Sequence, residues 1–374
     1  MRRCWPALAL VVVLVSGCSG EPAAAPSAEP SESTPRLGAD LDVVAAVYPL
    51  AWVAGEVAPY ADLQLLNEGG QDAHDLDLSP LQRAEVETAD VVLYAGPLDY
   101  QPQVEVAVEA AEGEVVDASE AAGEAALLLA SESGDAHGPE DVDEDEPEDA
   151  PTDEPAEPTA SPAPDASTPP SASTSPTAGT EGTEGEETGE ETGEETGDER
   201  IDPHLWFSPS IMARVAVATG EAFAEADPDN AEEYRTSAAR VRDDLMALGA
   251  EVEVLLGEEE CLFEEAVVSH AAYGYLLDPY GKRQHPLTGV GAEGDASAGE
   301  LAEVVREIRD QGFRYVLAEP VEGRAGAEAV AEEAGVELLE ISPLDAVSEE
   351  QAARGLPALV LAQARRFSIA LGCT

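Results

Sequence analysis

Short apolar runs alternate with stretches of helical periodicity from about residue 42 onward. The runs are continuous rather than alternately apolar and polar, which is typical of strands in a parallel sheet covered by helices on both faces. In the first part of the chain this pattern predicts strands at residues 43–47, 63–66, 91–95 and around 115–116, and helices at 50–57 and 79–88. Ser79 followed by Pro80 supplies the cap and first turn of the second helix.

The later part of the chain repeats this alternation. After a helix at residues 210–226, we expect strands at 266–269, 315–318 and 336–341, with helices at 297–310, 324–334 and 348–371. The two halves share an architecture without obvious identity in sequence. The pattern therefore predicts an α/β fold of two lobes, each with a parallel sheet flanked by helices.

One long amphipathic helix separates the two sets of strands. Between residues 231 and 255 apolar side chains recur at alternating spacings of three and four residues, which is the helical period. About 25 residues at 1.5 Å each reach on the order of 40 Å, long enough to run along two lobes and join them. A coiled coil is the alternative, which Gly249 and the many alanines disfavour.

Residues 132–199 interrupt the first lobe with a segment of different composition. This acidic tract holds 24 acidic residues and no lysine or arginine, is rich in Pro, Ser, Thr and Gly, and ends in a Glu-Glu-Thr-Gly repeat. Such a sequence cannot bury enough apolar surface to fold. We expect a disordered loop.

The charge of the chain excludes some classes of partner. There are 79 acidic residues against 18 lysines and arginines, a formal net charge of −61. The acidic tract accounts for less than a third of the acidic residues, so the lobes are acidic as well. A surface of this sign repels phosphates, which argues against nucleic acid and anionic lipid head groups as partners. It suits a cationic ligand or a salty habitat, and solubility alone is the ordinary alternative.

The first residues have the features of an export signal. Arg2 and Arg3 precede an apolar core at residues 7–15 that is too short to span a bilayer as a stable anchor. Val15-Ser16-Gly17-Cys18 resembles the lipobox of bacterial lipoproteins, in which cleavage leaves the cysteine as a lipid-modified N-terminus. We expect a chain outside the cytoplasm, anchored through lipid on Cys18 to the outer face of the cell membrane. An ordinary secretory signal is the alternative.

These features divide the chain into consecutive regions. We expect a signal peptide at 1–17, a flexible tether at 18–40, the first lobe at 41–131 and 200–226 with the acidic loop at 132–199 inserted, a linking helix at 227–257 and the second lobe at 258–374.

If Cys4 leaves with the signal and Cys18 carries lipid, Cys261 and Cys373 remain. Outside the cytoplasm two such cysteines usually pair. A disulfide between them would close a loop of about a hundred residues, worth about 4–5 kcal/mol in the chain-entropy model. Two free thiols or thiol ligands are the alternatives.

Three of the five histidines lie at or near the ends of predicted strands. His74 follows the strand at 63–66, His270 directly ends the strand at 266–269, and His204 lies on a loop before the helix at 210–226. Glu319 and Asp345 follow the last two strands. In parallel α/β sheets ligands bind beyond the carboxyl ends of the strands, so we expect these groups to meet at the cleft between the lobes.

Three imidazoles and a carboxylate drawn from both lobes would form a tetrahedral zinc site at the lobe interface. Imidazole suits Zn²⁺, whereas Mn²⁺ prefers more oxygen ligands. For one histidine alone a capped or core position is as common, but the joint placement favours a metal. The predicted ligands are His74, His204 and His270 with Asp345, and Glu319 or water is the alternative for the fourth position. His285, near Lys282 and Arg283, is assigned to a surface loop.

The motifs around these histidines resemble a known family. Val44 to Val57, His74-Asp75-Leu76-Asp77-Leu78-Ser79-Pro80, Asp202-Pro203-His204-Leu205-Trp206-Phe207-Ser208-Pro209, Asp227-Pro228-Asp229-Asn230 and Ser269-His270-Ala271-Ala272-Tyr273-Gly274-Tyr275 are similar to the zinc/manganese solute-binding lipoproteins of ABC importers. The resemblance implies two α/β lobes joined by one long helix, a metal at the lobe interface, and delivery of the ion to a membrane permease. We expect the chain to be a monomer. The resemblance also implies His74, His204 and His270 as metal ligands, and a histidine rather than a carboxylate at the third position favours zinc over manganese.

Two features depart from the family. An Asp-Pro-Leu motif is usual after the strand at 336–341, whereas here Ser342 occupies the aspartate position, which leaves the fourth ligand open. The acidic tract lies where zinc members often carry a loop rich in histidine and acids, but it contains only His137. It is either a weak antenna whose carboxylates concentrate Zn²⁺ or Ca²⁺, or a solvated spacer.

Two other classes of function remain as alternatives to metal capture. A secreted zinc hydrolase also uses three protein ligands and an open fourth position, but the chain has no His-Glu-x-x-His and no recognisable general base beside a ligand histidine. A surface protein with a structural zinc would unfold when stripped of metal, whereas an importer component should stay folded when empty. A manganese-binding importer component is the nearest variant of the leading hypothesis.

Overall fold

The computed structural model describes residues 37–67, 73–74, 76–130, 200–257, 261–288, 297–320 and 323–373, which belong to one compact unit. The expected signal peptide, Cys18 and the acidic tract lie outside the described residues. Over the part of the chain that is described, no helix is both long and apolar enough to cross a membrane.

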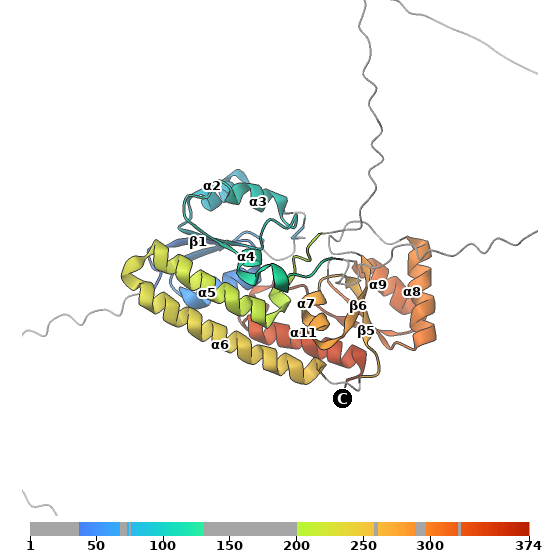
Figure 1. Cartoon of the computed structure of the whole chain (residues 1–374). Coiled ribbons are helices and arrows are strands. Elements are labelled where there is room, and N and C mark those ends of the chain that lie inside the picture. The colour runs from blue at the N-terminus through green and yellow to red at the C-terminus, as the bar shows by residue number, and fades with distance from the viewer. Residues whose placement is uncertain are drawn as a thin grey trace, which may run out of the picture. The chain divides into compact units, whose positions relative to one another are not determined.

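The first lobe, which carries the labels β1, α2 and α3 in Figure 1, contains a four-stranded parallel sheet in the order β2-β1-β3-β4. Each apolar run of the first half is a strand, as predicted. The central strand β1 pairs Val43 with Leu63 of β2 on one side and with Val91 of β3 on the other. The elements are β1 (Asp42–Ala45), α1 (Tyr48–Val57), β2 (Asp62–Leu65), α2 (Pro80–Thr88), β3 (Val91–Tyr94), α3 (Pro102–Val108), β4 (Glu114–Asp117), α4 (Ala118–Ala122), η1 (Glu124–Ala126), η2 (Leu205–Phe207) and α5 (Pro209–Ala226).

The second lobe repeats this topology with the strand order β6-β5-β7-β8, again all parallel. Its edge strand β6 was not predicted, and the assignment of His285 to a surface loop was wrong, because His285 lies within β6 and is buried. The elements are β5 (Glu265–His270), α7 (Gly274–Leu277), η4 (Asp278–Tyr280), β6 (Arg283–Thr288), α8 (Ala298–Gln311), β7 (Tyr315–Ala318), α9 (Arg324–Ala334), β8 (Glu337–Glu340), α10 (Glu349–Ala352) and α11 (Leu356–Leu371).

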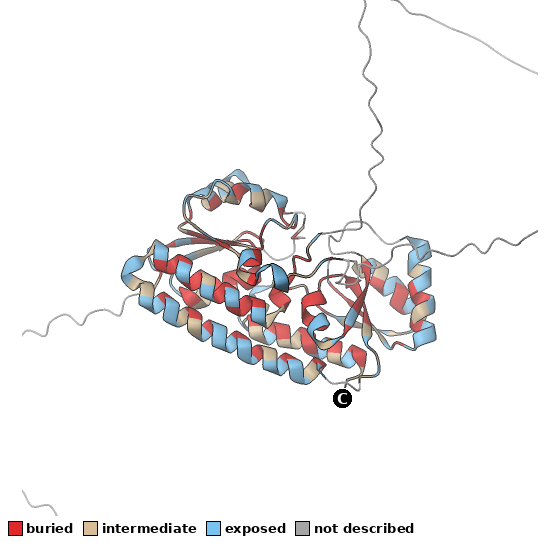
Figure 2. Cartoon of the chain, in the orientation of Figure 1, coloured by how far each residue is buried: buried red, intermediate tan, exposed pale blue. Residues whose placement is uncertain are grey.

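The long helix is α6 (Ala231–Leu256), entered through the short turn η3 (Pro228–Asn230). It contacts α1 and α5 of the first lobe and α11 of the second, as expected of a helix that joins two lobes. Its buried positions are close to the predicted stripe, and Figure 2 shows them facing the neighbouring helices. The contact with α5 is close: a Cβ on Gly220 would lie 2.4 Å from Cβ of Ala238, so only glycine fits there.

The last predicted helix, at residues 348–371, is in fact two helices. α10 ends at Ala352, and α11 begins at Leu356. Gly355 between them has a φ of 77°, which a continuous helix does not allow, and Pro357 occupies the first turn of α11. The apolar period continues across this break, which is why the sequence suggested a single helix.

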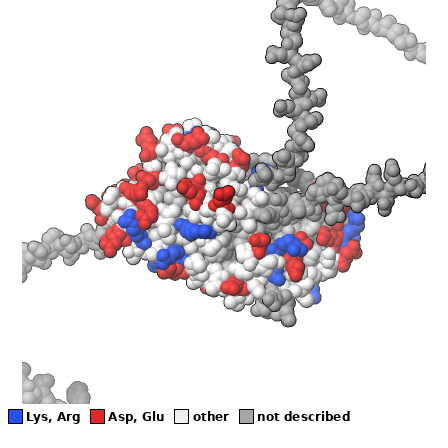
Figure 3. Space-filling model, in the orientation of Figure 1, with Lys and Arg blue, Asp and Glu red and all other residues white. Residues whose placement is uncertain are grey.

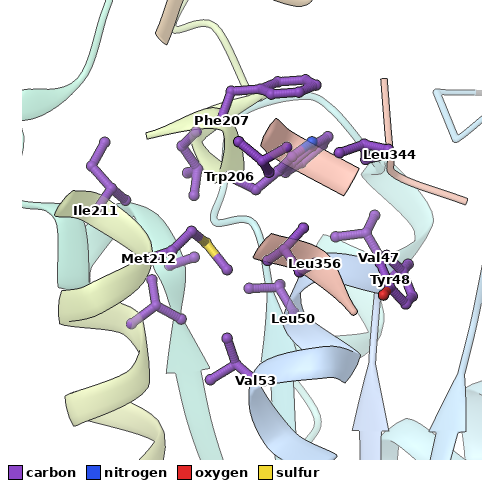
Figure 4. Packing of buried hydrophobic residues seen from close by; sticks show 14 of the residues in the cluster. Val47, Tyr48, Leu50, Val53, Trp206, Phe207, Ile211, Met212, Leu344 and Leu356 are labelled. Atoms are coloured by element: carbon purple, nitrogen blue, oxygen red, sulfur yellow. The ribbon is translucent and has the colours of Figure 1, made fainter. Parts of the chain in front are cut away.

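One hydrophobic core extends through both lobes. In Figure 4, Leu344 and Leu356 of the second half lie beside Val47, Tyr48 and Leu50 of the first. The backbone N–H of Tyr48 donates to the carbonyl of Asp345 at 2.8 Å, so hydrogen bonds as well as apolar contacts join the lobes.

Cys261 and Cys373 are joined by a disulfide in the structure. The bond ties the segment before β5 to the end of α11, where Phe263 N–H also donates to the carbonyl of Leu371. A closed loop of 112 residues is long enough for the bond to stabilise the second lobe by about 4–5 kcal/mol in the chain-entropy model.

The surface is predominantly acidic. On the face shown in Figure 3, acidic side chains are spread widely and basic ones form a few smaller groups. Several arginines are paired with neighbouring carboxylates, for example Arg235 with Glu221 at 2.7 Å and Arg240 with Glu56 at 3.0 Å. These exposed pairs add little to stability, but the excess of acid that remains attracts cations.

Candidate metal centre

His74, His204 and His270 come together in the structure. One ring nitrogen from each lies within 4.8 Å of the other two, and the ring centroids are 4.9–5.6 Å apart. A tetrahedral zinc ion holds two nitrogen ligands about 3.4 Å apart. Side-chain movements of about 1 Å would therefore close the three nitrogens around one ion.

His270 is placed by the end of a strand. It is the last residue of β5, fully buried, and its Nδ1 lies 3.3 Å from Oε2 of Glu319, the residue that follows β7. The other oxygen of Glu319 accepts a hydrogen bond from the Tyr273 hydroxyl at 2.6 Å, and its backbone N–H donates to Ser269 Oγ. Glu319 thus faces Nδ1 of His270, which directs Nε2 of the ring away from the carboxylate.

His204 is held in the same manner from the first lobe. Its Nδ1 lies 2.8 Å from Oδ1 of Asp202, which also accepts from the His204 backbone N–H at 2.9 Å. Both side chains are buried. Carboxylates that bind the second nitrogen of a histidine fix its tautomer and orientation, and this arrangement is usual behind metal-binding histidines.

The loop that carries His204 is anchored at both sides of the acidic tract. Leu129 and Ile201 form an antiparallel bridge, and Asp202 N–H donates to the carbonyl of Leu128 at 2.9 Å. The Tyr275 hydroxyl, from α7 of the second lobe, donates to the carbonyl of Asp202 and accepts from the N–H of Leu128, each at 3.0 Å. Burial, with the Asp202 carboxylate nearby, raises the pKa of Tyr275, so this hydroxyl stays protonated and can donate. The 68-residue tract is therefore inserted without displacing His204.

His74 is the least enclosed of the three histidines. It lies between β2 and α2, is partly exposed, and its ring meets that of Tyr100 edge-on at 4.7 Å. Gln101 holds the same loop through a hydrogen bond from its side chain to the carbonyl of Ala73. An ion could enter on the side of His74, because the other two rings are buried.

Asp345 is the predicted fourth ligand. Among the described residues, the group of ligand atoms within 4.8 Å of one another contains the three histidines but neither Asp345 nor Glu319. The Oδ1 of Asp345 accepts from the N–H of Ala346 at 2.7 Å, while the carbonyl of Asp345 accepts from the N–H of Tyr48.

Ser342 lies at the position where an aspartate was expected, and its hydroxyl accepts from the N–H of Leu344. The Trp206 indole donates to the carbonyl of Pro343 at 2.7 Å. Leu344 has a φ of 65°, a costly conformation held by these contacts. The loop is thus built to dock the lobes together.

The charges around the cluster match a divalent cation. Asp202 and Glu319 are buried, and each faces an imidazole nitrogen rather than solvent. Two negative charges next to three neutral imidazoles would balance one dication, whereas the same carboxylates are costly to bury alone. Asp202 was not predicted as a functional residue, and Glu319 was predicted only as an alternative ligand. The Asp-Pro-His order, which places a carboxylate two residues before His204, could have indicated the role of Asp202.

Comparisons with known proteins agree with this description. The family model described as "ZnuA: Zinc-uptake complex component A periplasmic" matches residues 43–364. The zinc-binding protein AdcA of Streptococcus pyogenes is 29% identical over 154 residues, which is 41% of this chain and 30% of that protein. The zinc-binding lipoprotein AdcA of Streptococcus pneumoniae is 30% identical over a similar share. The chain thus matches about a third of the length of these curated relatives.

Solved structures show the same fold. The periplasmic zinc-binding protein TroA of Treponema pallidum superimposes with a TM-score of 0.64 at 18% identity, covering 88% of this chain and 98% of that one. The Zn(II)-bound ZnuA-like domain of Streptococcus pneumoniae AdcA gives a TM-score of 0.59 at 19% identity, covering 89% and 99%. The expectation of two α/β lobes joined by one long helix is confirmed.

Proposed function

The chain belongs to the periplasmic zinc-uptake complex component A family, and we propose that it captures Zn²⁺ outside the cytoplasm and delivers the ion to the permease of an ABC importer. The observation that carries the proposal is the convergence of three histidines from both lobes on one point. Relatives that match part of the chain are named zinc-binding, which supports zinc as the ion.

In this proposal His74, His204 and His270 bind zinc, and a water molecule takes the fourth position. Asp202 and Glu319 hold two of the rings so that one nitrogen of each faces the ion. Three nitrogen ligands favour Zn²⁺ over Mn²⁺, which prefers oxygen. An importer component must also release its ion, and a site formed between two lobes can open when they move apart.

We further propose that the chain acts at the outer face of the membrane, held by lipid on Cys18. The disulfide between Cys261 and Cys373 fits an oxidising compartment, and the Streptococcus pneumoniae relative is named a lipoprotein. A Cys18→Ser variant should be released from cells into the medium. If that variant stayed in the membrane fraction, a different anchor would be required.

Zinc titration of the purified protein tests the metal site. The wild-type chain should show one tight zinc event, and His204→Ala should weaken it by about 100- to 1,000-fold while the protein stays folded. His137→Ala, which removes the histidine of the acidic tract, is the matched control and should bind as the wild type does. Tight zinc binding that survives His204→Ala would refute the proposed site.

The hydrolase alternative receives no support from the family match, since the family is one of zinc uptake rather than catalysis. The structural-zinc alternative is tested by removing the metal from the purified protein. Metal-free protein should keep its circular dichroism spectrum and unfold cooperatively, because the core and the disulfide already join its parts.

A further inference from the structure

A second group of metal-binding side chains lies in the second lobe. Glu265 is the first residue of β5, His285 lies in the edge strand β6, and Glu307 lies on α8. One ligand atom from each lies within 4.8 Å of the other two. We call these three residues the Glu265–His285–Glu307 cluster.

The distances within the cluster are longer than those of ordinary hydrogen bonds and close to those between two ligands of one metal ion. His285 Nδ1 is 3.5 Å from Oε2 of Glu307 and 3.8 Å from Oε1 of Glu265. A charge-assisted N–H···O bond is about 2.7–2.9 Å long. Two ligands of one tetrahedral zinc ion, each about 2.0–2.2 Å from it, are about 3.3–3.5 Å apart. Side-chain movements of about 1 Å would close the three atoms around one ion.

The burial of the cluster allows an ion to enter from solvent. The His285 side chain is 7% exposed, whereas those of Glu265 and Glu307 are 28% and 35% exposed. Val267 pairs with His285 across the two strands, and Val267 and Leu287 belong to the small core beneath α8. The imidazole is therefore fixed by the sheet and that core, while the two carboxylates form the outer side, where water can complete the coordination.

The cluster is separate from the three-histidine centre. Glu265 and His270 are the two ends of β5, and five residues of strand span about 16 Å. The cluster lies at the amino end of the strand, away from the edge where ligands of parallel sheets usually bind. With a neutral imidazole its two carboxylates carry a charge of about −2, which a dication would balance.

We propose that Glu265, His285 and Glu307 bind a second divalent first-row metal ion, with Zn²⁺ as the best fit. A single imidazole and two partly exposed carboxylates make this site weaker than the three-histidine centre, and its ligands suit Zn²⁺ or Mn²⁺ by type. The ion joins the edge strand β6 to α8, so its effect is to stabilise the second lobe. This proposal does not depend on the function of the three-histidine centre.

The test measures zinc binding by the full chain in the His204→Ala background, where binding at the three-histidine centre is weakened about 100- to 1,000-fold. One equivalent of zinc should still bind at the Glu265–His285–Glu307 cluster. Adding Glu307→Gln should weaken this binding by tenfold or more. Glu303→Gln, one turn earlier on α8 and outside the cluster, is the matched control and should leave it unchanged. Both glutamates reach solvent, so neither change should disturb the fold, which the melting temperature without zinc will verify.

Thermal unfolding gives a second reading of the same site. At a free zinc concentration about 100 times the dissociation constant of the second site, the melting temperature of His204→Ala should rise by about 3–6 °C. This rise should vanish when Glu307→Gln is added to the same variant. Equal zinc binding and equal melting shifts in the Glu303→Gln and Glu307→Gln variants would overturn the proposal. Because the tight site is tested by His204→Ala alone, each proposal can fail without the other.

Discussion

Two candidate metal sites lie near opposite ends of β5, and they place their carboxylates differently. At the carboxyl end, His270 meets two other histidines, and the carboxylates of Asp202 and Glu319 lie behind the rings. At the amino end, His285 is the only imidazole, and Glu265 and Glu307 face its Nδ1 directly. In the first cluster buried carboxylates orient the imidazoles that we propose as zinc ligands, whereas in the second the carboxylates would be ligands themselves.

This difference matters because selective binding of one metal ion requires different ligands from the general attraction of cations. In the proposed function three oriented imidazoles would favour Zn²⁺ over harder cations, and their enclosure between the lobes would let the two lobes control release. Carboxylates at the surface attract any divalent cation and exchange it readily with water. The first cluster is thus suited to capture and delivery, and the second to stabilising one lobe.

The largest contrast is expected in the dependence on pH. An imidazole must be neutral to bind a metal, and free imidazole gains its proton below about pH 6.5. In the range where all the rings are protonated, zinc affinity should fall by up to about a thousandfold per pH unit at the three-histidine centre. It should fall by up to about tenfold per unit at the Glu265–His285–Glu307 cluster, which has one imidazole.

These slopes are measured by zinc competition titrations between pH 7 and pH 5. Tight binding in the Glu307→Gln variant reports the three-histidine centre, and the binding in His204→Ala that Glu307→Gln further weakens reports the second cluster. Equal slopes in the two variants would contradict the assignment of three imidazoles to one ion and one to the other.

A smaller effect is expected from Asp202→Asn. The carboxylate 2.8 Å from His204 Nδ1 fixes the orientation of the ring, and losing such a group typically weakens metal binding by about 10- to 100-fold. The change should leave the second cluster untouched, so zinc binding there is an internal control in the same protein. If affinity at the three-histidine centre were unaffected, Asp202 would have no part in positioning His204.

The smallest effect is expected from Asp345→Asn. Because the carboxylate of Asp345 lies outside the histidine cluster and its Oδ1 accepts from Ala346 N–H, removing its charge should change zinc affinity by less than about threefold. Titration beside the wild type measures this. A loss of tenfold or more would mean that Asp345 is a ligand, as the sequence first suggested, and that water does not take the fourth position.

Much of the fold could be predicted from local pattern. The runs at residues 91–95 and 315–318 are strands because continuous apolar residues require burial on both faces, and α6 follows from its spacing of three and four. β6 was missed because Arg283, Gln284, His285 and Pro286 contain no apolar run. A proline is tolerated there because β6 is an edge strand, and that position is a property of the sheet rather than of the segment.

The sequence by itself determined most of the strands, the long helix and the three histidines that lie near strand ends, because these depend on short stretches of chain. Only the tertiary structure decided which groups face them. Asp202 is two residues from His204 and was readable in principle, but Glu319 reaches His270 across two strands. The Glu265–His285–Glu307 cluster needs two strands and a helix to meet. Side chains far apart in sequence acquire a shared function only when packing fixes their separation to within about an ångström of what one ion requires.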